Sequence, residues 1–156
     1  MAIEIERKFL VIGEAWRGEV RNNCYYKQGY MANAEGGASV RVRIAGEDAN
    51  INIKSMTLGV SRQEYEYPIP LADAEQMLNT LCPGPVIEKT RYFVDFNGHT
   101  WEVDVFEGDN AGLVVAEIEL SAEDEAFDLP SWVGDEVSDD PRYYNVCLVQ
   151  HPYKDW

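Results

Sequence analysis

Residues 3–11 read IEIERKFLV, a stretch in which apolar and charged side chains alternate. Successive side chains of a β-strand point to opposite faces of the sheet. Glu4, Glu6 and Lys8 therefore fall on one side of an extended chain, and the isoleucines and Phe9 fall on the other. The stretch predicts a strand with one apolar face and one charged face.

The same alternation recurs along the chain, broken by short turns such as Gly36-Gly37, Leu58-Gly59 and Asn97-Gly98. Asn97-Gly98 is the strongest hairpin signal, because both residue types tolerate the positive φ of a type I′ turn. Eight strands joined by short loops favour an antiparallel sheet or barrel. We expect these strands at residues 3–11, 24–31, 39–45, 50–56, 62–69, 86–96, 100–106 and 113–120.

Helix signals are few. Apolar residues between Leu71 and Leu81 share one helical face, and the following CPGP sequence, residues 82–85, ends that helix. Ser121 with Asp124 predicts the cap of a short second helix. Asp140 before a proline predicts a third helix over residues 141–149. We expect a mainly β (α+β) fold with these three helices beside the sheet.

One face of the expected sheet collects seven of the 13 Lys and Arg residues and eight of the 28 Asp and Glu residues. An antiparallel sheet with one solvated face would explain mixed charges. A closed barrel would instead enclose them, and buried charges need an ionic ligand. Arginine, which binds phosphate in a bidentate manner, favours the second reading. The charged face comprises Glu4, Glu6, Lys8, Arg41, Arg43, Lys54, Arg62, Glu64, Glu66, Lys89, Arg91, Glu102, Asp104, Glu117 and Glu119.

The composition and charge of the chain disfavour several classes of protein. The formal net charge of −15 disfavours broad nucleic-acid binding. No apolar run approaches the roughly 18 residues of a membrane helix, and the N-terminus lacks the apolar block of a signal peptide. Three scattered cysteines indicate reduced thiols in a cytoplasmic protein, and two histidines disfavour a His-rich zinc site. Without repeats or linkers, we expect one domain over residues 1–156.

Several charged motifs occur in a fixed order along nearly the whole chain. They are Glu4-x-Glu6-x-Lys8, Gln28-Gly29-Tyr30, Arg41-x-Arg43, Lys54, Arg62-x-Glu64-x-Glu66, Glu88-Lys89-Thr90-Arg91, Glu102-x-Asp104, Glu117-x-Glu119 and Arg142-Tyr143-x-Asn145. This ordered set resembles the CYTH superfamily, the triphosphate tunnel metalloenzymes, and most of all its short bacterial inorganic tripolyphosphatases. The resemblance implies an eight-stranded antiparallel β-barrel that forms a charged tunnel, with residues 141–149 as a C-terminal plug helix.

The resemblance also implies roles for the charged residues, with Mg²⁺ or Mn²⁺ as cofactor because hard cations prefer oxygen ligands. The expected metal ligands are Glu4, Glu6, Glu117 and Glu119, with Asp104 as a weaker candidate. The expected substrate-binding residues are Lys8, Arg41, Arg43, Lys54, Lys89 and Arg91. Catalytic roles are expected for Lys89, Glu4 and Lys8. Arg62, Glu64 and Glu66 are expected to tie the lining together, and Tyr143 and Tyr144 to pack the terminal helix.

The implied activity is hydrolysis of the terminal phosphoryl group of a triphosphate, with inorganic tripolyphosphate as the first candidate. Three alternatives remain open: a class IV type adenylyl cyclase, a thiamine or nucleoside triphosphatase, and a polyphosphate-binding module without catalysis. In each case the expected partner is a small triphosphate-containing molecule, and neither nucleic acid nor a membrane is expected.

Overall fold

The computed structural model describes residues 3–33, 37–57 and 59–156. Its strands are β1 (Ile3–Val11), β2 (Val20–Asn33), β3 (Ala38–Ala45), β4 (Asp48–Ser55), β5 (Ser61–Pro68), β6 (Ile87–Phe96), β7 (His99–Phe106), β8 (Val114–Glu119) and β9 (Val133–Glu136). The eight predicted strands are all present within a few residues of their expected ends. The four-residue β9 was missed, because VGDE carries no alternating pattern.

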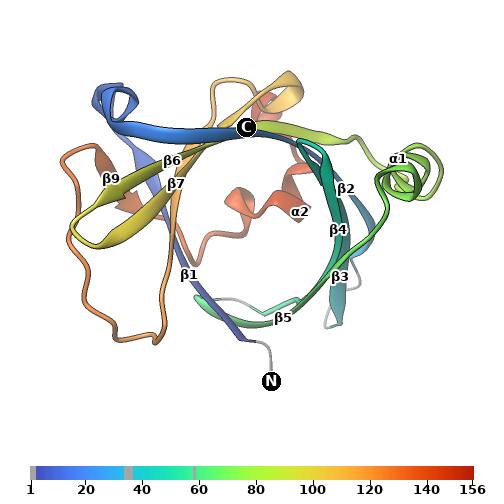
Figure 1. The fold of residues 1–156 in the computed structure, drawn as a ribbon, viewed down its shortest axis with the longest axis horizontal. Coiled ribbons are helices and arrows are strands. Elements are labelled where there is room, and N and C mark those ends of the chain that lie inside the picture. Colours follow the sequence, from blue (N-terminus) through green and yellow to red (C-terminus); the bar gives the residue numbers. More distant parts are fainter. Residues whose placement is uncertain (1–2, 34–36, 58) are drawn as a thin grey trace.

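The sheet closes on itself through β1 (Figure 1). The strand order is β5-β4-β3-β2-β6-β7-β8-β1-β9, all antiparallel, and β1 also pairs with β5. The first part of β1, from Ile3 to Ile5, pairs with β5, whereas Phe9 and Val11, further along the same strand, pair with β9. Strands β1 to β8 therefore form a closed eight-stranded barrel, which confirms the expected fold, and β9 is an addition.

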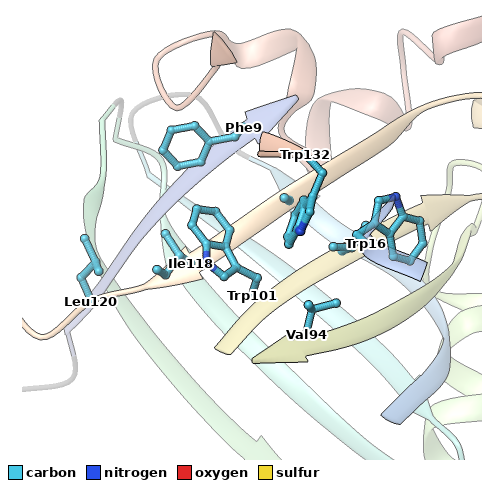
Figure 2. Packing of buried hydrophobic residues seen from close by; sticks show 9 residues of the cluster. Phe9, Trp16, Val94, Trp101, Ile118, Leu120 and Trp132 are labelled. Atoms are coloured by element: carbon cyan, nitrogen blue, oxygen red, sulfur yellow. The ribbon is translucent and has the colours of Figure 1, made fainter. Parts of the chain in front are cut away.

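The apolar face of the barrel wall points outward into a core formed with the segments that cover it (Figure 2). Trp101 on β7 lies at the centre, with its ring centroid 5.5 Å from that of Phe9 and 5.8 Å from that of Trp132. The 3₁₀ helix η1 (Ala15–Glu19) adds Trp16 to this cluster. With the apolar side chains outside, the charged side chains on the alternate positions are directed into the barrel.

Helix α1 (Leu71–Thr80) confirms the first helix prediction and covers the outside of β3 and β4. It comes close to β2 at Gly29, where an added Cβ would lie 2.9 Å from Leu78 Cδ2 and 3.1 Å from Cys82 Cβ. A glycine at this position therefore allows the helix to pack directly on the strand. Within the described residues, no helix has the length and apolar character that crossing a membrane requires.

The predicted turn at Asn97-Gly98 is confirmed, with φ values of 48° and 85° at the two residues. Gly36 and Leu58, from the other two predicted turns, lie outside the described residues.

The helix predicted at Ser121 and Asp124 is wrong, because this segment forms only turns. The Ser121 backbone N–H donates to the side-chain oxygen Glu125 Oε1 at 2.6 Å, and Glu125 also contacts His99. These side-chain bonds hold the loop in place of a regular helical ladder.

The continuous helix predicted over residues 141–149 is also wrong. The segment consists of the 3₁₀ helix η3 (Pro141–Tyr143), an extended Tyr144, and the short helix α2 (Asn145–Leu148). The carbonyl of Tyr143 accepts a hydrogen bond from Lys8 Nζ at 2.9 Å, which replaces a bond that a continuous helix would use. Asp140 caps η3 as expected, since its side chain accepts from the Arg142 N–H.

Helix α2 lies across the opening of the barrel in the axial view (Figure 1). Leu148 packs against Ile87, Phe106 and Val115, which come from β6, β7 and β8. These apolar residues occupy the same alternate positions as the charged lining. One end of the barrel interior is therefore apolar and sealed by the C-terminal segment, which ends in the 3₁₀ helix η4 (Tyr153–Asp155).

Candidate active site

The barrel encloses a cavity of about 600 Å³. The ten principal candidate site residues expected from the sequence line it: Glu4, Glu6, Lys8, Arg41, Arg43, Lys54, Lys89, Arg91, Glu117 and Glu119. Asp104, the weaker candidate metal ligand, is not among the residues that line this cavity. Seven cationic and seven acidic side chains contribute to this lining. The alternation in the sequence thus placed each of these side chains on the correct side of the wall.

Two arginines on β3, Arg41 and Arg43, line the cavity with few acidic partners. Arg41 reaches Glu66 only at 3.6 Å, and its Nε is buried without a hydrogen-bond partner among the described residues. Arg43 donates from Nε to the neutral amide oxygen of Gln28 at 3.0 Å. Burial, with Arg41 and Arg91 nearby, lowers the pKa of Arg43 to about 10. This concentration of positive charge would be relieved by an anion in the cavity.

Lys89, Asp104 and Arg91 form a buried cluster on β6 and β7. Lys89 Nζ donates to Asp104 Oδ2 at 2.7 Å, and Arg91 binds both oxygens of the same carboxylate at 2.8 and 2.9 Å. Lys89 and Asp104 are each 0% exposed. Asp104, a weaker candidate metal ligand in the sequence, is therefore engaged by the two cations. Arg91 also contacts Glu102 at 2.6 Å, which leaves its guanidinium largely neutralised.

The pKa values of the two cations of this cluster shift in opposite directions. Burial lowers the pKa of Lys89 to about 7, and the neighbouring Arg91 acts in the same direction. Burial also opposes the charge of Arg91, but Asp104 and Glu102 hold its pKa above the ordinary value. Lys89 is therefore the cation whose charge responds to pH near neutrality and to the charge of whatever enters the cavity.

Carboxylates gather where β1 pairs with β8. The register sets Glu6 opposite Glu119 and Lys8 opposite Glu117. Burial, together with Glu117 and Glu4, raises the pKa of Glu6 well above its ordinary value. Burial and Glu4 likewise raise the pKa of Glu119. Like charges placed opposite each other on paired strands are unfavourable without a cation between them.

The other two carboxylates of this group, Glu4 and Glu117, form ion pairs with lysines. Lys54 Nζ lies 2.8 Å from Glu4 Oε2, and Lys8 Nζ lies 3.4 Å from Glu117 Oε1. Within residues 3–33, 37–57 and 59–156, no three potential ligands already stand at the spacing of a metal-binding group. The carboxylate oxygens nevertheless fit a hard divalent cation, which prefers oxygen ligands. Four carboxylates lie on the paired strands β1 and β8, and the raised pKa values of two of them show that their negative charges lack a balancing cation.

Other lining residues were missed by the sequence analysis or given a lesser role. Asn52 shares the face of Lys54 on β4 and donates to Glu64 and Glu66 at 3.0 Å, a position that the strand alternation could have identified. Tyr144 was expected only to pack, yet it lines the cavity with the Arg62 guanidinium 5.0 Å from its ring centroid. Other lining residues of this kind include Tyr30, Ser39, Glu102, Ser138 and Asn145.

The fold and the lining together define a class of protein, a closed antiparallel β-barrel that encloses a charged cavity. Residues 2–144 match the CYTH domain. The chain belongs to the CYTH family, as the ordered motifs of its sequence indicated.

Proteins of known name and structure resemble the whole chain. An inorganic triphosphatase of Acetivibrio thermocellus is 47% identical over 156 residues, which is 100% of this chain and 99% of the relative. An inorganic triphosphatase of Nitrosomonas europaea is 39% identical over 94% of this chain and 96% of the relative. The crystal structure of the inorganic triphosphatase NE1496 superposes with a TM-score of 0.69 at 36% identity, covering 96% of this chain and 95% of that one.

Proposed function

We propose that this chain is a metal-dependent triphosphatase that removes the terminal phosphoryl group of a triphosphate, with inorganic tripolyphosphate as the principal substrate. The observation that carries the proposal is the pair Arg41 and Arg43, which lines an enclosed cavity with few acidic partners. The relatives named inorganic triphosphatase, at 47% and 39% identity, support the choice of substrate.

Substrate binding is assigned to the basic part of the lining. A triphosphate carries about four negative charges, and its hydrolysis depends mainly on positioning and on neutralising these charges. Arg41 and Arg43 have the donors to hold its phosphate oxygens. The remaining cations of the cradle are Lys8, Lys54, Lys89 and Arg91. In the reaction, water attacks the terminal phosphorus, the bridging P–O bond breaks, and phosphate and pyrophosphate are formed.

Metal binding is assigned to the carboxylates Glu4, Glu6, Glu117 and Glu119. Mg²⁺ or Mn²⁺ held there would neutralise phosphate charge and lower the pKa of water. Lys54 and Lys8 pair with Glu4 and Glu117 in this structure. Once a cation balances the glutamates, each of these lysines can donate a hydrogen to phosphate oxygens in place of the glutamate, and Lys8 keeps its bond to the Tyr143 carbonyl.

Lys89 is assigned to the scissile phosphoryl group. Its ammonium lines the cavity and is bonded to Asp104, which keeps it in place. Because burial lowers the pKa of Lys89 to about 7, both forms exist near neutral pH. A polyanion in the cavity favours the charged form, so we assign Lys89 to neutralise charge as the P–O bond breaks.

A phosphate-release panel tests the proposed function. Inorganic tripolyphosphate, thiamine triphosphate and ATP would each be incubated with Mg²⁺, Mn²⁺ or a chelator. We expect release from tripolyphosphate with either metal, no release with chelator, and loss of release in Glu117→Gln. That variant also excludes a contaminating phosphatase. Formation of cyclic AMP from ATP would show that the protein is an adenylyl cyclase and would overturn the proposal. Thermal stabilisation by tripolyphosphate without turnover would replace it with a binding module.

Glu6→Gln tests the metal assignment without measuring activity. The raised pKa of Glu6 means that its protonated form stabilises the fold, and this contribution is lost as pH rises through the folded-state pKa. At pH 8 without metal, the neutral glutamine should raise the melting temperature by about 2–4 °C, equivalent to about 1 kcal/mol.

The same variant should lose most of its response to Mn²⁺. A metal at one hundred times its Kd stabilises a protein by about 2.7 kcal/mol, and differential scanning fluorimetry would detect this in the wild type. Glu125→Gln is the matched control, because this carboxylate pairs with His99 outside the cavity. An equal Mn²⁺ shift in Glu6→Gln and the wild type would rule out Glu6 as a ligand.

A further inference from the structure

Asn145 connects the C-terminal segment to the buried lysine of the cavity. Its side-chain oxygen Oδ1 accepts hydrogen bonds from Lys89 Nζ at 3.1 Å and from Gln28 Nε2 at 3.3 Å. Lys89 and Gln28 are both 0% exposed, and they belong to the neighbouring strands β6 and β2. Asn145 itself belongs to α2 and lines the cavity. The proposed reaction assigns no role to Asn145.

The segment that carries Asn145 is anchored on both sides. Before Asn145, the Tyr143 carbonyl accepts from Lys8 Nζ at 2.9 Å, and the Tyr144 hydroxyl donates to the Ser138 carbonyl at 2.7 Å. After it, Leu148 is 1% exposed in the apolar end of the barrel. These contacts fix the backbone of Asn145 relative to the barrel wall, so its short side chain has little freedom.

A lysine side chain has four rotatable bonds, and a fixed orientation for its nitrogen requires more than one partner. Asp104 supplies one acceptor at 2.7 Å, and Asn145 supplies the second at 3.1 Å from another part of the chain. Two of the three ammonium hydrogens are then occupied, which leaves the third for a ligand in the cavity that Lys89 lines.

The chemical nature of the second acceptor suits this arrangement. A carboxylate at position 145 would add negative charge beside a polyanionic substrate, whereas a neutral amide orients the ammonium without that repulsion. Gln28 holds the same amide oxygen and accepts from Arg43 Nε through its own oxygen. The amides of Gln28 and Asn145 thus connect Arg43 to Lys89.

We infer that Asn145 is a positioning residue, which aims the Lys89 ammonium at the scissile phosphoryl group from the C-terminal segment. The inference rests on the proposed triphosphatase function. It predicts that Asn145 acts on catalysis only through Lys89, and that the C-terminal segment completes the active site.

Steady-state kinetics with tripolyphosphate test this inference. Asn145→Leu keeps the approximate bulk but removes the acceptor, and we expect kcat to fall by about 10-fold to 100-fold, the range for a lost hydrogen bond to a charged group. The KM should change less than threefold, since other cations hold the substrate. Asn145→Asp restores an acceptor and should recover a substantial part of kcat. Gln150→Ala, which shortens an exposed amide on the same segment, is the matched control and should retain wild-type kinetics.

A double-mutant comparison separates positioning from a merely structural role. In a Lys89→Met background, Asn145→Leu should have no further effect on kcat, because the group through which it acts is absent. Independent, multiplicative losses would overturn the inference, as would wild-type kcat in Asn145→Leu or equal losses in the Leu and Asp variants. A wild type without triphosphatase activity would instead contradict the proposed function.

Discussion

Lys89→Met should lower kcat for tripolyphosphate hydrolysis by about 10²–10³-fold, the usual effect of removing one preorganised group that stabilises developing charge. Methionine keeps an unbranched chain of similar length in a site that is 0% exposed. Burial disfavours the lysine charge, as its lowered pKa of about 7 indicates, and Asp104 keeps two bonds from Arg91. The variant should therefore remain folded while losing activity. Phosphate release and circular dichroism would be measured together.

Lys154→Met is the control for this substitution. Lys154 is exposed and pairs with Asp109 at 3.3 Å outside the cavity, so the same chemical change should leave kcat unaltered. Activity of Lys89→Met within threefold of the wild type would remove Lys89 from the catalytic group. A loss of circular dichroism signal would instead indicate that the buried ammonium is needed for folding.

Asp104→Asn should cause the largest loss of stability among the single substitutions of the site. Asp104 is 0% exposed and is shared by Lys89, at 2.7 Å, and by Arg91, at 2.8 and 2.9 Å. Removing its charge leaves two buried cations without their common partner. The free energy of unfolding should fall by about 3–5 kcal/mol, the usual cost of breaking a buried ion pair from one side. Urea denaturation would measure this change.

Two comparisons make the stability prediction specific. Asp109→Asn removes the same charge from an exposed pair and should cost less than about 1 kcal/mol. Adding Lys89→Met to Asp104→Asn should recover part of the lost stability, because one uncompensated cation is then absent. If Asp104→Asn and Asp109→Asn had equal effects, the buried cluster would not contribute to stability as proposed.

Much of the barrel was predictable because side-chain direction in a strand is a local property. The alternation around Glu4, Arg41 and Lys89 indicated which side chains line the inner wall before any strand pairing was known. Alternate residues of a strand point to the same side whatever the strand pairs with. The terminal helix was not predictable in the same way. Its interruption depends on Lys8, which is far away in the sequence and takes the carbonyl of Tyr143.

Candidate residues could likewise be selected from the sequence, but their partners could not. Alternation together with the family motifs selected ten residues that line the cavity, although their catalytic and metal-binding roles remain proposals. No pattern in the neighbouring sequence indicated that Asp104 pairs with the buried cations or that Asn145 hydrogen-bonds to Lys89.

Residue order alone therefore establishes which side chains face inward and which family the chain resembles. Which charges are neutralised, and which still need a ligand, follows only from the folded barrel. That distinction depends on strand register, on closure of β1 against β5, and on the placement of the C-terminal segment. Electrostatic partners are set by distances of a few ångströms between residues that are remote in the chain, and those distances exist only once the barrel has closed.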